Sequence, residues 1–387
     1  IRPLGVGINL QPSAVRELYD LGFEKGLEEI GVRTRDYGMY SKMGLEIWTE
    51  PRGLWAGYRW PQYSVHRGLL HMMLYRALIA RAGIESVQTG WTATGFDNDG
   101  DEALLHLVSA SGEKRTEHGA IVIGADGIHS ALRAQIAPNE GPPVWAGAVL
   151  WRGTTRAKPF KTGASMVMVG HSRCRFVSYP ISKTDPDTGL ATINWIANLA
   201  YPPDAHWNKE DWNRRAKLDD FLPRYTDWTF PWLNVPELVL GAKEVFEYPM
   251  VDRDPLDRWT HGRMTLVGDA AHAAYPVGSN GAGQAIVDAR KLGRAFLDHG
   301  VTPEALEAYE AEMRPATTKV VLTNRTAGPD AILDVIEERC GGQFDRIEDV
   351  ISREELADHA NRYKAIAGFA VDALNAAPAI IPEDARV

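Results

Sequence analysis

The residues best suited to chemistry lie together in residues 262–284. Residues 263–267 alternate between polar and apolar side chains and then become apolar, which predicts a short buried strand. The strand ends at Gly268 and Asp269, and a loop rich in glycine follows. A helix is predicted over residues 282–300. The stretch therefore predicts a strand, an acidic corner, a glycine-rich loop and a helix N-terminus, in that order.

This arrangement suits a flat or anionic ligand. Backbone amides at a helix start can face an anion or an electron-rich ring. Glycines allow a flat ligand to approach the main chain closely. Asp269 at the strand end can accept hydrogen bonds from ligand hydroxyls. His272 lies in the same loop, and we interpret it as a structural histidine rather than a catalytic group.

A second unit of the same kind occurs earlier in the chain. Residues 120–124 (AIVIG) form a continuous apolar run, which is typical of a strand in a parallel, doubly covered sheet. Asp126 and Gly127 follow, and a short helix is predicted over residues 131–137. An Asp-Gly pair is a common turn, so from the residues alone we favour a turn or helix N-cap for Asp126. Its place between a strand and a helix keeps a binding role open.

Composition narrows the class of protein. The chain has 387 residues, enough for one large domain or two, and a formal net charge of −9, which argues against nucleic acid and anionic membranes as partners. It has no apolar run of membrane-spanning length. Its two cysteines, Cys174 and Cys340, fit a reducing compartment, so we expect a cytoplasmic protein. The spacing of the histidines and cysteines predicts no metal site.

The remaining pattern predicts alternating helices and strands around these two units. A strongly apolar helix over residues 69–82 is expected to be buried. Antiparallel strands are predicted over residues 87–124, and a further sheet over residues 148–199. The other predicted elements are helices at 12–21, 24–30, 207–225, 303 onward with a kink at Pro315, and 352–374, and strands at 34–40, 46–48 and 245–249.

Four motifs together resemble a known family. They are the loop at residues 2–7, Arg67 in the run HRGLL, residues 124–130 (GADGIHS), and residues 268–281, which begin GDAAH. The chain resembles the class A FAD-dependent aromatic hydroxylases of the p-hydroxybenzoate hydroxylase fold, over nearly its whole length. Within that family it looks most similar to the phenazine hydroxylases of the 5-methylphenazine-1-carboxylate 1-monooxygenase type, which share runs such as RPLGVGIN and MVDRDPL.

The resemblance implies a mixed α/β fold with a Rossmann-like FAD/NAD(P)-binding domain, an inserted antiparallel or mixed β-sheet substrate domain and C-terminal helices. The resemblance implies five segments. The FAD-binding domain has a first part (1–70) and a second part with a β-hairpin region (71–147). The substrate domain (148–250) follows, then the part of the FAD-binding domain with the flavin-ring loop and helices (251–325), and then the C-terminal helices (326–387). Family members begin with a βαβ unit that carries GxGxxG. That unit is absent here, and we expect that the functional protein has it and that the present chain omits it.

The resemblance also implies residue roles. Arg2, Gly7 and Arg67 would bind FAD, Asp126 its diphosphate region, and Asp269 its ribityl or ribose hydroxyls. Gly278, Asn280, Gly281 and Ala282 would line the isoalloxazine ring, and Pro276 and Gly278 would lie at the reacting position. Trp195, Tyr179 and Tyr248 are expected to contact the substrate, although core packing is the alternative for each.

The implied activity is hydroxylation of an aromatic substrate, with a phenazine-like heterocycle as the narrower candidate, by NAD(P)H and O2 through a C4a-hydroperoxyflavin. Two alternatives stay open. One is a flavin reductase or dehydrogenase on the same fold, and the other is a degenerate, flavin-free protein that binds a small aromatic or a protein partner. We expect a monomer or homodimer.

Overall fold

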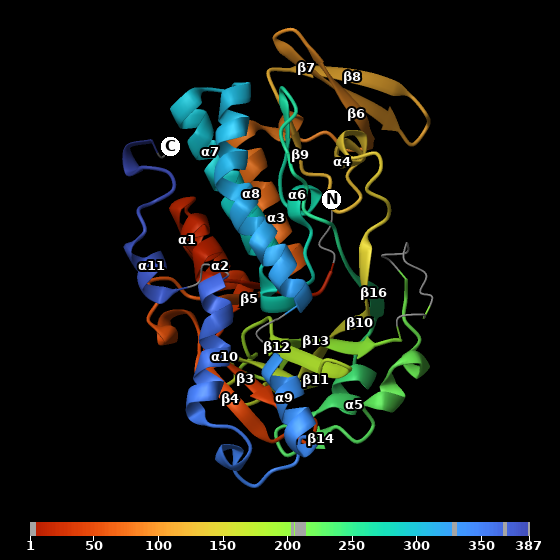
Figure 1. Cartoon of the computed structure of the whole chain (residues 1–387), viewed down its shortest axis with the longest axis vertical. Helices are drawn as coiled ribbons and strands as arrows, with labels where there is room; N and C mark the ends of the chain where they lie inside the picture. Colours follow the sequence, from red (N-terminus) through yellow and green to blue (C-terminus); the bar gives the residue numbers. More distant parts are fainter. Residues whose placement is uncertain (1–4, 203–204, 206–213, 327–330, 367–369, 386–387) are drawn as a thin grey trace.

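The computed structural model describes residues 5–202, 205, 214–326, 331–366 and 370–385. Two parts lie one above the other in Figure 1. The upper part contains the long helices α3 (Arg67–Ala82), α7 (Gly281–His299) and α8 (Pro303–Thr326), and the lower part contains the largest sheet. The fold is therefore mixed α/β, as predicted. None of the described helices combines the length and apolar character that a membrane span requires.

The largest sheet has seven strands in the order β16-β10-β13-β12-β11-β3-β4. All neighbours are antiparallel except β11 and β3, which are parallel. Its strands are β3 (Asp36–Tyr40), β4 (Glu46–Pro51), β10 (Val144–Ala157), β11 (Ser165–His171), β12 (Cys174–Pro180), β13 (Ala191–Ala200) and β16 (Val245–Asp252). The strands predicted within residues 148–199 are confirmed. Residues 36–51 supply two further strands, so this sheet combines segments that are distant in the sequence.

The two faces of this sheet differ in what they meet. Side chains alternate between the faces along each strand. Trp151 of β10 packs on one face in a core with Phe176 and Trp195. Its neighbours Leu150 and Arg152 line a cavity on the other face. One face is therefore a closed hydrophobic core, and the other is available to a ligand.

The upper part contains smaller sheets. Strands β1 (Gly7–Leu10), β5 (Tyr63–His66) and β2 (Gly31–Arg33) form one, and β6 (Trp91–Asp99), β7 (Glu102–Ser109) and β8 (Lys114–Gly119) form another. The predicted strands at the two acidic corners, β9 (Val122–Gly124) and β17 (Met264–Leu266), pair in parallel. The two corners therefore lie next to each other at the carboxyl ends of neighbouring strands.

Shorter helices connect these sheets and cover them. They are α1 (Pro12–Asp20), α2 (Glu24–Ile30), α4 (Ala131–Ile136), α5 (Val235–Leu240), α6 (Asp269–His272), α9 (Ala331–Cys340), α10 (Arg353–Ile366) and α11 (Val371–Ala376). Strands β14 (Thr229–Phe230) and β15 (Leu233–Asn234) form a small hairpin. A core of apolar residues from β3, β4, α9 and α10 joins the C-terminal helices to the large sheet.

Three sequence predictions need correction. Helix α3 is not buried: Leu69 and Leu78 are 43% and 47% exposed, because only one side of the helix meets the protein. The helix predicted over residues 207–225 is replaced after residue 213 by short 3-10 turns at Leu218–Asp220 and Leu222–Arg224, and residues 206–213 lie outside the described part. The last predicted helix is divided into α10 and α11. Its predicted N-cap is confirmed, since the Glu355 amide donates to Ser352 Oγ.

Arg133 of α4 connects the two acidic corners. Its buried guanidinium donates to the carbonyls of Ala270 and Ala271 and pairs with Glu140. It also donates to the carbonyl of Asp254. One side chain therefore ties the helix after the first corner to the helix that begins at the second.

We predict that Arg133→Ala lowers the free energy of unfolding by about 1–3 kcal/mol for each buried carbonyl that loses its donor, at Ala270 and Ala271, while Glu140 keeps its pair with Arg253. Chemical denaturation measures this change. Arg294→Ala, which removes the exposed pair with Asp298, is the control and should leave stability within error. Equal effects of the two substitutions would contradict the role of Arg133.

Candidate functional site

A cavity of about 710 Å³ lies between the large sheet and the loop that precedes α7. The loop contributes Pro276, Gly278, Asn280, Gly281 and Ala282, all of which were singled out from the sequence. The sheet contributes mainly apolar side chains, which include Leu150, Met166, Met168, Val177 and Ile196. The cavity therefore has one wall of loop backbone and one apolar wall.

The loop turns sharply just before the helix begins. Gly278 and Ser279 both have positive φ, 73° and 57°. Asn280 is the N-cap of α7, but its side chain does not cap the first turn. A Cβ added to Gly281 would meet nothing within 4 Å. The first amides of a 19-residue helix thus have no side-chain cap, at a part of the cavity wall where Gly278 and Gly281 contribute only backbone.

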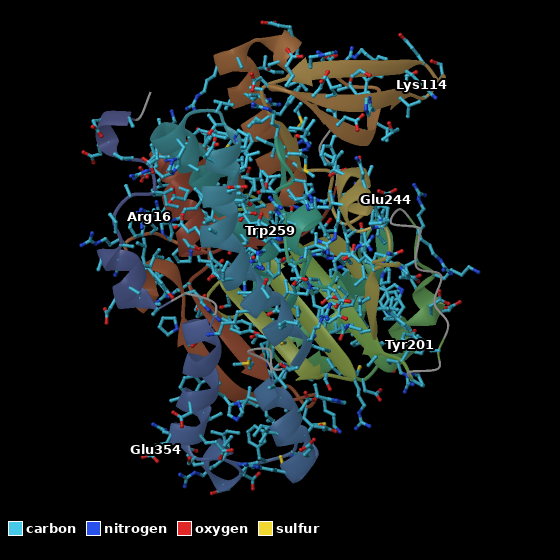
Figure 2. The ribbon with its side chains drawn as sticks, turned by 45° about the horizontal axis from the view of Figure 1, so that its top comes forward. Arg16, Lys114, Tyr201, Glu244, Trp259 and Glu354 are labelled. Carbon is cyan, nitrogen blue, oxygen red and sulfur yellow. The ribbon has the colours of Figure 1, made fainter. Side chains whose placement is uncertain are left out.

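Asp288 of α7 fixes the acidic corner from behind. It is fully buried, and its Oδ2 accepts from the Gly268 amide at 2.9 Å and from His272 Nε2 at 2.5 Å. The ring of Trp259, which is labelled near the centre of Figure 2, lies with its centroid 5.5 Å from that of the His272 ring. His272 thus has the structural environment that we predicted. Asp288 was missed, although an acid on the apolar face of a predicted helix is a signal.

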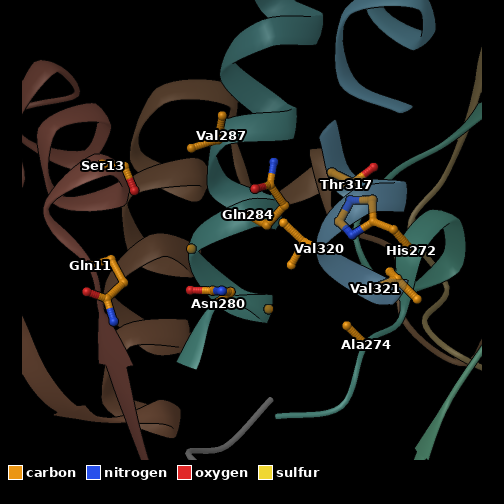
Figure 3. A pocket seen from close by; sticks show the side chains of 12 residues that line it. Gln11, Ser13, His272, Ala274, Asn280, Gln284, Val287, Thr317, Val320 and Val321 are labelled. Carbon is orange, nitrogen blue, oxygen red and sulfur yellow. The ribbon is translucent and has the colours of Figure 1, made fainter. Parts of the chain in front are cut away.

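A second, smaller cavity lies behind the loop. It measures about 30 Å³, enough for a solvent-sized molecule, and is shown in Figure 3. Gln11 lines both cavities and donates to the Gly278 carbonyl at 3.4 Å. Asn280 also lines both. The Gln11 side chain therefore connects the start of α1 to the loop.

Asp269 and Arg67 come together at the cavity wall. Both line the cavity, and burial raises the pKa of the Asp269 carboxyl, while His272 and Arg67 lower it. The Arg67 side chain lies against the Gly5 backbone, where an added Cβ would be 2.8 Å from Nε. The structure therefore brings an acceptor and a cation from two distant motifs to one end of the cavity.

Other predicted cofactor residues are placed differently. Asp126 is exposed, and its Oδ2 accepts from the Ala131 amide at 2.8 Å, as a helix cap does. The Gly7 amide donates to Asn194 Oδ1 at 2.7 Å, and Gly7 is not among the residues that line the cavity. Arg2 lies outside the described residues.

The three aromatic residues that were predicted to contact the substrate lie in different environments. Tyr179 lines the cavity, and burial raises its pKa to about 12, so its phenol stays protonated near neutral pH. Tyr248 lies beside the site, with its ring 5.9 Å from the Arg152 guanidinium. Trp195 is fully buried in the core on the opposite face of the sheet. We therefore leave Trp195 out of the proposed substrate contacts.

The sequence did not reveal the charged residues that line the sheet side of the cavity among its apolar side chains. Arg52, Arg152 and Arg175 all line the cavity, and Arg52 pairs with Glu50 at 2.8 Å. Alternation along β10 places Arg152 on the same face as Leu150, but it does not say which face of the strand lines the cavity. The faces could not be distinguished before the packing was known.

Asp288→Ala should destabilise the corner, because it leaves the buried Gly268 amide and His272 without an acceptor, at about 1–3 kcal/mol for each. Denaturant unfolding measures the loss. Asp298→Ala, on the surface of the same helix, is the matched control. An Asp288→Ala protein as stable as the control would show that the pairing does not hold the corner.

Comparison with known proteins identifies the family. The profile described as "FAD binding domain" matches residues 240–324, which include the acidic corner and α7. The phenazine 1,6-dicarboxylic acid hydroxylase PhzS of Lysobacter antibioticus is 42% identical over 84% of this chain and 81% of its own length. The 3-amino-4-hydroxybenzoate 2-monooxygenase PtmB3 of Streptomyces platensis is 30% identical over 89% of this chain and 85% of its own length.

Solved structures share the fold. HpxO of Klebsiella pneumoniae, in complex with FAD and uric acid, superposes with a TM-score of 0.71 at 20% identity, over 98% of this chain and 90% of that one. A salicylate hydroxylase substrate complex superposes with a TM-score of 0.70 at 22% identity, over 97% of this chain and 92% of that one.

The residues at the loop end of the cavity fit a flavin. A flat ring can lie against the glycine-lined loop, and its carbonyl edge can face the uncapped amides of α7. Asp269 lies at the same end of the cavity, and a carboxylate there can accept hydrogen bonds from hydroxyls. Together with the relatives, these features show that the chain belongs to the family of FAD-dependent aromatic hydroxylases.

Proposed function

We propose that this protein hydroxylates a planar, phenazine-like heteroaromatic substrate with NAD(P)H and O2. The observation that carries the proposal is the cavity of about 710 Å³ that extends from the α7 loop to the apolar face of the large sheet. The 42% identity to a phenazine 1,6-dicarboxylic acid hydroxylase supports the choice of substrate class. Bound FAD supplies the redox chemistry, since it takes electrons from the nicotinamide and passes them to oxygen.

At the loop end of the cavity, the protein's task is to hold the ring. The amides of Gly281 and Ala282 would face its carbonyl edge, while Pro276 and Gly278 would lie along the ring. Asp269 would accept from hydroxyls of the ribityl chain, and Arg67 would add positive charge nearby. These contacts orient the cofactor toward the sheet.

The sheet's task is to position the substrate and to exclude water. Met166, Met168, Val177 and Ile196 form an apolar surface opposite the loop. A planar ring would pack on this surface and bring one edge toward the flavin. An apolar wall would also keep water from the reacting position and so limit side reactions. Tyr179 adds a neutral hydroxyl that can bond to a substituent of the substrate.

A spectrum of the purified protein, before and after addition of FAD, tests the cofactor. Oxidation of NAD(P)H with phenazine-1-carboxylate in the presence of 18O2 then tests the reaction. We expect a flavin spectrum and one labelled oxygen atom in the product. Flavin reduction without labelled product would favour the reductase alternative, and a protein that takes up no FAD would contradict the proposal.

Asp269→Ala should retain less FAD than the wild type after gel filtration, because the hydroxyls of the flavin chain lose their acceptor. A reduction of about tenfold in affinity corresponds to one such hydrogen bond. Asp298→Ala, on the exposed side of α7, is the control. Equal FAD occupancy in wild type and Asp269→Ala would argue against the assigned role.

A further inference from the structure

Methionine is concentrated at the wall of the cavity. Four of the nine methionines of the chain line it, namely Met39, Met166, Met168 and Met250. Their sulfur atoms are polarizable and electron-rich, and the proposed function uses these side chains only as apolar surface. Leucine has a similar volume and would fill such a wall as well. Packing alone therefore does not explain the choice of a side chain that contains sulfur.

Met168 of β11 lies within the sheet wall of the cavity. In the register of the strands it is opposite Val177 on one side and Met39 on the other, and all three side chains line the cavity. Met168 is partly exposed, whereas Met39 is only 3% exposed. A reactive group that forms inside the cavity can therefore reach the sulfur of Met168 without passing through bulk solvent.

The phenol of Tyr37 donates a hydrogen bond to Met168 Sδ at 3.3 Å. Burial raises the pKa of this phenol to about 12, while the charges of Arg52 and Arg175 oppose the rise, so the donor keeps its proton near neutral pH. Among the described methionines, Met168 is the one whose sulfur accepts a hydrogen bond. A thioether is a weak acceptor, and a sulfoxide oxygen is a stronger one. The same phenol would therefore stabilise an oxygen atom added to this sulfur.

We propose that Met168 is a modification site, whose sulfur receives the activated oxygen atom when no substrate occupies the cavity. This inference rests on the proposed function, since bound FAD supplies that oxygen. The thioether gains one S–O bond and is oxidised to the sulfoxide. The other oxygen atom of O2 leaves as water, whose two hydrogens come from NAD(P)H and one proton. NAD(P)H and the sulfur each supply two of the four electrons that O2 takes up.

This oxidation would change the surface on which the substrate ring packs. A sulfoxide is polar, whereas the thioether that it replaces is apolar. Val177 and Ile196 follow Met168 in the register across the strands, and both belong to the apolar surface opposite the loop. A bound substrate would cover the sulfur and receive the oxygen itself. Turnover without substrate would therefore weaken the binding of the next substrate molecule.

Peptide mass spectrometry after turnover under 18O2 tests the modification. The FAD-loaded protein is incubated with NAD(P)H and without substrate, and catalase removes peroxide from the bulk solvent. Labelled sulfoxide at Met168 should exceed that at Met43, which is 51% exposed, by about tenfold, because oxygen delivered inside the cavity acts at high effective concentration. Phenazine-1-carboxylate in the same incubation should suppress the labelling of Met168. Equal labelling of Met168 and Met43, or labelling that the phenazine leaves unchanged, would overturn the proposal.

Added hydrogen peroxide, without NAD(P)H and catalase, provides the comparison. This reagent attacks from bulk solvent, so exposure decides which sulfur reacts. We expect Met43 to be oxidised before Met168, and Met264, which is 0% exposed, to stay reduced. The same order of oxidation in both incubations would show that turnover does not direct oxygen to Met168.

Three variants test the role of the sulfur and of its donor. Tyr37→Phe removes the donor and should lower labelled sulfoxide at Met168. Met168→Leu should bind phenazine-1-carboxylate equally before and after incubation with NAD(P)H, whereas the wild type should lose about tenfold in affinity. Met43→Leu is the matched control and should lose affinity as the wild type does. A wild type that keeps its affinity after Met168 is labelled would contradict the effect on binding.

The fate of NAD(P)H and of the label separates this inference from the proposed function. A protein that takes up FAD, consumes NAD(P)H and hydroxylates the phenazine, but leaves Met168 unlabelled, contradicts this inference alone. A protein that labels Met168 but forms no labelled phenazine product contradicts the proposed substrate and supports the modification. A protein that takes up no FAD contradicts both.

Discussion

The site depends on a buried carboxylate that lies outside it. Asp288 accepts from the Gly268 amide and from His272, and these bonds hold the end of β17 and α6 against α7. The loop between them must therefore cross a fixed gap, and it does so with positive φ at Gly278 and Ser279. Because a backbone turned in this way presents amides and little side chain, a flat ring can lie against it. Asp288, which lies behind the loop, thus determines the backbone surface that the loop presents to the cavity.

The large sheet provides the opposite wall. Because side chains alternate between its two faces, neighbouring residues of one strand belong to the hydrophobic core and to the cavity in turn. Trp151 and Trp195 fill the core on one face, and Leu150, Arg152 and Ile196 meet the cavity on the other. Packing on the core face keeps the strands rigid, so the cavity side chains are held in place.

The sequence predicted the parts that are encoded locally. The corner at Asp269, the turn of the loop and the start of α7 all follow from glycine, proline and apolar spacing, and the structure has them in that order. The substrate wall was harder to predict. Both Trp195 and Tyr179 lie on predicted strands, and only the packing of α5 and nearby segments decides which face is buried. Strands β3 and β4 join the sheet through contacts far apart in the sequence, and helix α3 is apolar but only partly covered.

The most direct measurement is an experimental structure of the protein with FAD and phenazine-1-carboxylate. The account predicts the flavin ring against Gly278 and Gly281, with its carbonyl edge at the first turn of α7. It predicts the phenazine on the apolar face of the sheet, opposite the loop. A flavin ring bound away from this loop, or a phenazine bound away from this face, would contradict it.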